Sequence, residues 1–386
     1  MKAVVTGMIA TYPVGGVVWD YGQYLLGLER LGFEVYYLED TGGPTYNPTV
    51  RDYGEDPSFG LQYLQDALTG LSPGLKNRWH FRDQSGATYG IEAERLRQIM
   101  SEADLFLNVS GGTLLRDEYM KCARKVLIDS DPGWNHFVNY PKWDRGEGWP
   151  GTYGFRGHDY FFTYAERLGE PDCILPDFGL TWHPTRPVVV PECWSPCGRG
   201  QRWTTVMTWD NFRRPILYEG RAFGTKELEF PRIANLPRRV KVELEIGAGG
   251  GTAPVDEWRA AGWHVLDSHS VSETPGAYRD YICQSRGELS VAKNVYVATR
   301  SGWFSCRSVC YLAAGRPAVL QDTGFSERIE TGRGLFAFDD LESAAAALET
   351  VEANSALHQE AAAEIGREVF GYEKVLGQLL SDMGLG

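Results

Sequence analysis

The chain has 386 residues, of which 43% are hydrophobic and 23% are charged, and its formal net charge at pH 7 is −13. This length exceeds one compact core, so we expect two domains of about 180–200 residues each. The acidic balance argues against duplex nucleic acid as a partner, because a protein that binds the phosphate backbone carries a basic face. No run reaches the roughly 18–20 apolar residues that a membrane span requires, so none is expected.

The first residues and the cysteines bear on the cellular compartment. Residues 1–7, Met-Lys-Ala-Val-Val-Thr-Gly, reach a glycine before an apolar signal-peptide segment could form. The seven cysteines are odd in number and scattered, which argues against a disulfide framework. Both observations favour a reducing, cytoplasmic location.

Strand-like apolar runs alternate with amphipathic helical patterns through the first half of the chain. We expect strands at residues 3–6, 33–38, 105–109, 126–128 and 160–163, and helices at 19–31 and 91–102. Such alternation is typical of parallel α/β sheets. A glycine-rich loop follows the first strand, and its Gly15 and Gly16 would let backbone amides approach a phosphate or a sugar closely.

The alternation stops at residues 180–202, where repeated prolines exclude a helix or a central strand. We place an interdomain linker there. The pattern then resumes, with strands expected at 205–208, 240–246, 264–266, 295–298 and 318–320, and helices at 225–235, 254–261, 305–314 and 341–353. The sequence therefore predicts two tandem Rossmann-like domains, at residues 1–185 and 203–356.

The last thirty residues, 357–386, form a separate helical segment. Its apolar stripe consists of Phe370, Tyr372, Val375, Leu376, Leu379 and Leu380. This stripe has to be buried, either on the second domain or across the first.

The segment at residues 301–324 carries the most chemical information. The expected helix opens at Ser305, a good N-cap, and the free amides of its first turn favour an anion together with the helix dipole. Arg307 and Ser308 add a cationic fork and a hydroxyl to that turn. An ordinary capped helix with a surface arginine is the alternative. The polar turn after the next strand, at a carboxyl end where ligands bind in open α/β sheets, consists of Gln321, Asp322, Thr323 and Gly324.

This segment resembles the donor-binding segment of GT-B glycosyltransferases. The shared pattern is a helix, Ala-Ala-Gly-x-Pro, a strand and a polar turn at residues 305–324. Ser-Gly-Trp-Phe-Ser at 301–305 is similar to the His-Cys-Gly-Trp-Asn-Ser core of the plant-type enzymes, and Gln321-Asp322 resembles their Asp-Gln pair in reverse order. Over nearly its full length the chain also resembles an uncharacterised bacterial glycosyltransferase family, through residues 12–16, 281–282, 285–288 and 292–294.

The resemblance implies a GT-B fold with an interdomain cleft and a C-terminal helical segment that crosses back to the first domain. It implies an enzyme that moves a sugar from a UDP- or dTDP-sugar, held by the second domain, to a small-molecule or glycan acceptor on the first. Retaining relatives neutralise the donor diphosphate with a lysine at a place similar to Lys226. No metal and no further cofactor are expected, because Lys226, Arg307 and the helix amides would suffice and no Asp-x-Asp pair stands in the second domain.

The chain departs from the family pattern in the donor helix. Such enzymes place a Glu five residues before the helix-ending Gly to hold the ribose hydroxyls, and Cys310 stands there. Glu288 would replace this carboxylate, with an ordinary surface charge as the alternative. The leading His of the plant-type motif is also missing, since Arg300 and Ser301 stand in its place. The nucleotide and the stereochemistry therefore stay open.

An inverting transfer needs a general base beside the acceptor hydroxyl. The candidates are Asp20, after the Gly15-Gly16 loop, and Asp129, Asp131 and His136, after the strand expected at 126–128. Asp131 is slightly favoured, because loop residues at strand ends reach a cleft more easily than helix residues do.

Two other functions are left open. One is a nucleotide-sugar epimerase of the same architecture, which would convert the donor without an acceptor. The other is a non-catalytic partner of a glycosyltransferase, which the missing ribose Glu would fit. A homodimer is left open as well.

Overall fold

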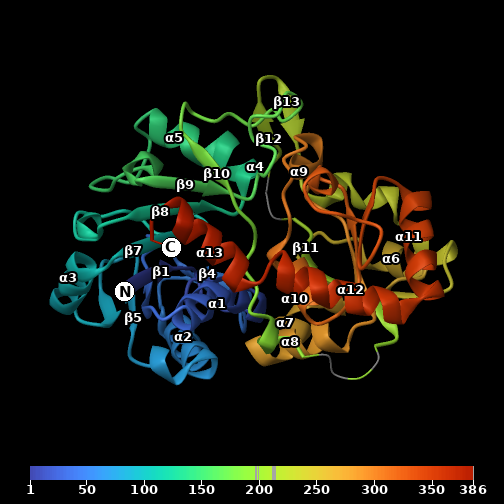
Figure 1. Ribbon diagram of the computed structural model, residues 1–386, viewed down its shortest axis with the longest axis horizontal. Coiled ribbons are helices and arrows are strands. Elements are labelled where there is room, and N and C mark those ends of the chain that lie inside the picture. Colours follow the sequence, from blue (N-terminus) through green and yellow to red (C-terminus); the bar gives the residue numbers. More distant parts are fainter. Residues whose placement is uncertain (196–197, 199, 211–213, 386) are drawn as a thin grey trace.

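Two mainly parallel sheets, each flanked by helices, make up the computed structural model, which describes residues 1–195, 198, 200–210 and 214–385 (Figure 1). The strand order is β10-β9-β8-β7-β1-β2-β5-β6 in the first sheet and β15-β14-β11-β16-β17-β18 in the second. All neighbouring strands in both sheets are parallel except the β5-β6 hairpin. The predicted fold class, α/β with two tandem Rossmann-like units, is confirmed.

The first sheet comes from the N-terminal half of the chain. Its strands are β1 (Lys2–Thr6), β2 (Glu34–Glu39), β5 (Trp79–Arg82), β6 (Thr88–Gly90), β7 (Leu105–Val109), β8 (Lys125–Asp129), β9 (Tyr160–Thr163) and β10 (Trp182–Pro184). The helices around it are α1 (Gly15–Arg30), α2 (Ser58–Leu71), α3 (Ala93–Glu102), α4 (Pro132–Trp134) and α5 (Tyr140–Asp144). A small hairpin, β3 (Thr45–Asn47) and β4 (Asp52–Gly54), follows β2.

The second sheet comes from the C-terminal half. Its strands are β11 (Arg202–Thr208), β14 (Glu243–Gly249), β15 (His264–Asp267), β16 (Gly287–Ser290), β17 (Ala318–Gln321) and β18 (Leu335–Phe338). A hairpin, β12 (Ile216–Tyr218) and β13 (Arg221–Phe223), follows β11. The helices are α6 (Val255–Ala261), α7 (Ser268–Ser272), α8 (Pro275–Gln284), α9 (Asn294–Ala298), α10 (Cys306–Ala313) and α11 (Leu341–Ala353).

Two predicted elements of this half are wrong. The strand expected at 295–298 is the helix α9. The helix expected at 225–235 is a series of single 3-10 turns at Lys226–Leu228, Phe230–Arg232 and Leu236–Arg238. Pro231 and Pro237 interrupt this segment, and a proline lacks the N–H that a longer helix needs.

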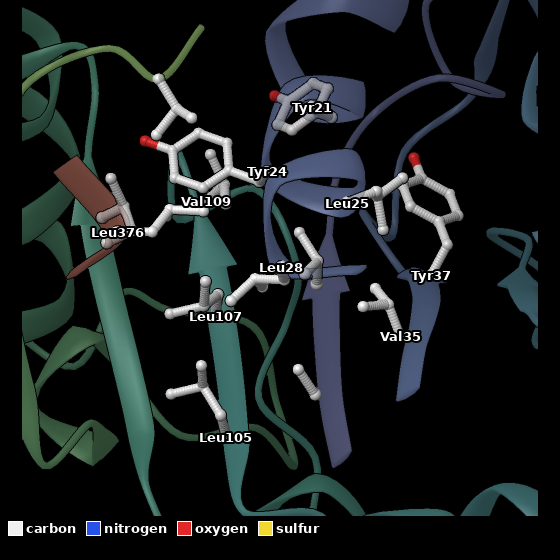
Figure 2. Close-up of a cluster of buried hydrophobic side chains, with 14 of the residues drawn as sticks. Tyr21, Tyr24, Leu25, Leu28, Val35, Tyr37, Leu105, Leu107, Val109 and Leu376 are labelled. Carbon is white, nitrogen blue, oxygen red and sulfur yellow. The ribbon is translucent and has the colours of Figure 1, made fainter. Parts of the chain in front are cut away.

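Helix α1 packs its apolar face against the first sheet. Figure 2 shows Leu25 and Leu28 of α1 lying over the side chains of β2 and β7, among them Val35 and Leu107. Leu376, from the C-terminal end of the chain, reaches the same cluster.

The C-terminal segment crosses from the second sheet to the first. Helix α12 (Ser355–Glu368) packs on α10, where Gly366 lies against Ala313. Helix α13 (Tyr372–Asp382) then lies over the first half, where Figure 1 places the C-terminus, and Gly27 of α1 leaves room for Leu376. The predicted crossover is thus confirmed. The limits 1–185, 203–356 and 357–386 stay a prediction, with the last strand of the first sheet ending at Pro184.

We expect Leu376→Ala to lower the free energy of unfolding by about 2–5 kcal/mol, because truncating a buried leucine leaves a cavity. Leu376 of α13 is fully buried against Gly27 of α1. This contact therefore attaches the crossover segment to the first half. Urea unfolding would measure the loss. Leu357→Ala, on the exposed side of α12, is the matched control and should stay within about 0.5 kcal/mol of the parent. Equal losses in the two variants would contradict this account of the crossover.

Candidate functional site

The loops that follow the strands of the two sheets meet at one junction. Asp131, after β8, accepts hydrogen bonds from Lys293 Nζ over 2.7 Å and from the Tyr296 hydroxyl over 2.6 Å. Trp303 Nε1 donates to the carbonyl of Ser130 over 2.9 Å. Because ligands bind outside the carboxyl ends of the strands in open α/β sheets, this junction is the candidate site.

The first turn of α10 lies at this junction, and Ser305 caps it, its Oγ accepting from the amide of Arg307 over 3.2 Å. The guanidinium of Arg307, however, is occupied within the second half of the chain. It donates to Glu288 Oε1 over 2.6 Å, to Ser290 Oγ over 2.6 Å and to the carbonyl of Val206 over 2.8 Å. Glu288 is fully buried and needs this counterion. The guanidinium of Arg307, expected to be open to a ligand, therefore forms a buried ion pair with Glu288. Glu288 is accordingly not a surface charge.

A buried lysine lies close to this ion pair. Lys226 Nζ donates to the carbonyl of Thr208 over 3.3 Å. Burial, reinforced by the nearby charges of Arg307 and Lys293, lowers the pKa of Lys226 to about 7. We call Lys226, Lys293 and Arg307 the cation cluster. The cluster gathers Arg307, Lys293 and Lys226, the last charged only in its protonated form, at the carboxyl ends of β11 and β16, where an anion would be stabilised.

The polar turn after β17 holds the junction together through internal hydrogen bonds. Gln321 Nε2 donates to Glu229 Oε2 over 2.5 Å, and Gln321 Oε1 accepts from the amide of Ala292 over 3.2 Å. Asp322 accepts from the amide of Gly324 over 2.9 Å, and Thr323 donates to the carbonyl of Trp303 over 2.6 Å. Gln321 and Thr323 thus fix the loop between β16 and α10, whereas Asp322 stabilises its own turn.

Gly15 and Gly16 belong to the first turn of α1 and not to an open loop. A Cβ on Gly15 would lie 2.3 Å from the carbonyl oxygen of Thr274, and one on Gly16 would lie 3.2 Å from the ring of Tyr278. The space beside both glycines is therefore filled by the start of α8. Their predicted contact with a phosphate or a sugar is replaced by close packing between the two halves.

Asp20 lies on the next turn of α1 and is partly exposed. Its carboxylate lies near the thiol of Cys306, the first residue of α10. Burial raises the pKa of Asp20 to about 6, and the hydrogen bond with Cys306 opposes this shift. Burial and the Asp20 carboxylate in turn raise the pKa of the Cys306 thiol, so the thiol stays protonated and donates. A carboxylate with a pKa near 6 is suited to accept a proton at neutral pH.

The other candidate bases are placed differently. Burial raises the pKa of Asp131, but the charge of Lys293 and the hydrogen bonds from Lys293 and Tyr296 outweigh it and hold the pKa below its usual value. His136 is fully buried, with Nε2 3.0 Å from Asp129 Oδ2 and Nδ1 2.6 Å from the carbonyl oxygen of Pro176. With a fully buried ring and both nitrogens engaged, His136 is less suited than Asp20 or Asp131 to meet an acceptor.

Two openings border the cation cluster. The cavity beside α10 measures about 20 Å³, room for roughly one water, and is lined in part by Ser308 and Gln321. The Ser308 hydroxyl is buried and has no hydrogen-bond partner among the described residues. A larger pocket of about 490 Å³ opens between Tyr12 of the first half and residues 249–251 of the second. Thr208, whose carbonyl accepts the hydrogen bond from Lys226, lines this pocket, whereas the three residues of the cation cluster do not.

Two residues of the junction have no functional role in the sequence-based prediction. Lys293 and Cys306 each contact an aspartate of the other half, Asp131 and Asp20 respectively. No local pattern marks either residue, because each pairing depends on how the two halves dock. In the described part of the chain, no group of three or more His, Cys, Asp or Glu side chains is arranged to hold a metal ion.

No protein-family profile matches the chain, and no curated protein sequence does. Solved structures are similar over its whole length. The alpha-glucosyltransferase AGT in complex with UDP aligns with a TM-score of 0.59 and 10% identity, covering 100% of both chains. AviGT4, a glycosyltransferase involved in avilamycin A biosynthesis, aligns with a TM-score of 0.55 and 13% identity, covering 99% of this chain and 96% of that one. Anabaena Alr3699/HepE in complex with UDP-glucose aligns with a TM-score of 0.55 and 11% identity, covering 100% and 99%.

These similarities establish the fold. The chain has the GT-B architecture of glycosyltransferases, with two Rossmann-like units and a C-terminal crossover, as the sequence resemblance implied. Among the described residues, no helix combines the length and the apolar character needed to cross a bilayer.

Proposed function

We propose that this protein transfers a sugar from a nucleoside-diphosphate sugar, a UDP- or dTDP-sugar, to a hydroxyl group of a small-molecule or glycan acceptor. The GT-B fold along the whole chain supports an enzyme of this class, and two of the similar structures, AGT and HepE, are described with UDP or UDP-glucose. The observation that carries the proposal is the cation cluster at the junction of the two halves.

The charge balance of the cluster favours a bound polyanion. Glu288 neutralises Arg307, and Asp131 neutralises Lys293. For Lys226, no carboxylate lies within 4.0 Å of the ammonium in the part of the chain that the structure describes. A buried ammonium without an anion is costly. A diphosphate would supply the missing charge, and Lys226 would stabilise it as it leaves the sugar, so that no metal is needed.

Asp20 is the better candidate for the catalytic base. It lies on the first half, beside the first turn of α10. With a pKa of about 6, its carboxylate is charged at pH 7 and is a stronger base than an ordinary aspartate. Asp131 is held by Lys293 and Tyr296, and its lowered pKa makes it a weak base. We therefore propose that Asp20 accepts the proton of the acceptor hydroxyl. Asp131 instead holds the two halves of the chain together.

Binding of a nucleoside diphosphate should take up a proton above pH 7. The bound diphosphate raises the pKa of Lys226 from about 7, so the neutral amine of the free protein becomes charged in the complex. Affinity should accordingly fall as pH rises from 7 to 9. Calorimetric titration of UDP and dTDP in buffers of different ionisation enthalpy measures the proton uptake. In Lys226→Met the uptake should vanish, and an unchanged uptake would contradict the role of Lys226.

A thermal-shift screen of UDP, dTDP, GDP and ADP tests the proposal as a whole. A nucleotide at a hundred times its dissociation constant adds about 2.7 kcal/mol of stability, which a melting curve resolves. Absence of any shift would contradict donor binding. Incubation with donor alone separates the alternatives, because an epimerase converts it and a transferase does not. Tight binding without turnover over an acceptor panel would instead favour a non-catalytic partner.

Three finer expectations remain predictions of the proposed function. AGT is described with a 13-mer DNA, whereas the net charge of −13 argues against DNA as the acceptor here. A cytoplasmic location and a homodimer are likewise predictions. Gel-shift measurement with duplex DNA at low salt addresses the first, and light scattering addresses the last.

A further inference from the structure

A separate pocket, of about 230 Å³, lies in the first half at the carboxyl ends of β7 and β8. None of its lining residues belongs to the cation cluster. The walls combine aromatic rings with amides and a hydroxyl, contributed by Asn108, Thr113, Asn139, Trp143, Trp149 and Tyr153.

The hydroxyl of Thr113 is left without a partner in this pocket. Asn108 holds the backbone of Thr113 on both sides, through a bond from the Thr113 amide of 3.2 Å and one to its carbonyl of 3.0 Å. The side chain is only 3% exposed, and its Oγ1 has no hydrogen-bond partner among the described residues. Leaving a buried hydroxyl unpaired is unfavourable. A hydroxyl group of a ligand would satisfy it once the Thr113 side chain turns toward the pocket.

Aromatic rings at the same pocket are exposed to solvent. The Trp149 side chain is 53% exposed and that of Tyr153 is 45% exposed. Trp143 is held firmly, because Gly148 and Gly154 pack directly on its ring. An aromatic face offers an apolar surface on which the C–H face of a sugar ring can lie.

The pocket is electrically neutral. Among the described residues that line it, none is Asp, Glu, Lys or Arg. Burial lowers the pKa of His158, the only lining histidine in the described part of the chain, to about 4, so the ring is uncharged at pH 7. A charged ligand would find no counterion here and would have to bury an unpaired charge. A neutral ligand avoids this free-energy cost.

From these observations we infer that the pocket binds one neutral sugar ring. Its volume lies below the about 300–1,000 Å³ of drug-sized ligand sites, which fits a single ring. A polyhydroxyl ring would pair with Thr113 and stack on Trp149. That this pocket holds the sugar ring of the acceptor rests on the proposed function. The binding of a neutral sugar does not depend on it.

Saturation-transfer NMR of the full chain with methyl β-glucopyranoside, methyl β-galactopyranoside and methyl α-mannopyranoside tests this inference. At least one of these glycosides should bind, and Trp149→Ala should weaken it about tenfold. Thr113→Val, which removes only the hydroxyl, should weaken it as well. Glucose 6-phosphate should bind less tightly than the neutral glycosides. Phe59→Ala, an exposed ring on α2 outside the pocket, is the matched control and should change nothing.

The inference fails if no glycoside binds, if Trp149→Ala leaves binding unchanged, or if glucose 6-phosphate binds most tightly. Titration of the same variants with UDP and dTDP keeps the two proposals apart. Nucleotide binding without glycoside binding would overturn the sugar pocket alone. Glycoside binding without any nucleotide binding would uphold the pocket and contradict the proposed function.

Discussion

Asp20→Asn is expected to lower turnover by ~10²–10⁴ while leaving nucleotide binding intact. The substitution keeps the size of the side chain and its place beside Cys306 but removes the basic oxygen. The pH profile of kcat/KM adds a second test. In the parent it should rise with a pKa of about 6, as Asp20 loses its proton, and fall above about pH 7, as Lys226 loses its own. Steady-state kinetics from pH 5 to 9 would measure both limbs.

Two further variants make this prediction specific. Asp20→Asn should abolish the rising limb, and Lys226→Met should abolish the falling one. Asp131→Asn should mainly weaken the contact between the two halves, because Lys293 and Tyr296 of the second half donate to its carboxylate. A near-parental turnover of Asp20→Asn, together with a collapse in Asp131→Asn, would move the base to Asp131.

Arg307→Met is expected to lower the free energy of unfolding by about 3–5 kcal/mol, the usual cost of leaving one partner of a buried ion pair alone. The reason is Glu288, which is fully buried and loses its only counterion within the described residues. Its second carboxylate oxygen already has no hydrogen-bond partner among these residues. Urea unfolding at pH 7 would measure the loss.

The double variant Arg307→Met with Glu288→Leu is the control for this prediction. Removing both charges should recover most of the stability, because the cost arises from one unpaired charge and not from lost packing. A single variant within about 1 kcal/mol of the parent would contradict the buried pair. So would a double variant whose loss equals the sum of the two single losses.

Much of the fold could be predicted because its elements carry strong local patterns. The strands at 105–109 and 160–163 and the helix at 341–353 have the predicted bounds. The short apolar run at 295–298 favours a strand, yet periodicity cannot separate a short strand from a helical turn. Strand β16, Gly-Glu-Leu-Ser, was not predicted at all, because a buried glutamate and a buried serine break the apolar signature.

The candidate site could be predicted only in its location. The sequence predicts the start of α10, Glu288 and Lys226 as parts of a site, and the structure brings them together. It could not show that Arg307 pairs with Glu288, or that Asp20 meets Cys306, since these contacts join distant parts of the chain. For the same reason the sequence predicts a ligand beside Gly15 and Gly16. In the structure the start of helix α8 fills that space.

The most direct measurement is product analysis of UDP- and dTDP-sugars incubated with the protein, methyl glycosides as acceptors and a metal chelator. The account predicts that nucleoside diphosphate and a new glycoside appear together, and only when an acceptor is present. Conversion of the donor to an isomer without an acceptor would contradict it. Release of nucleoside diphosphate that stops in the chelator and returns with magnesium would contradict the role given to the cation cluster.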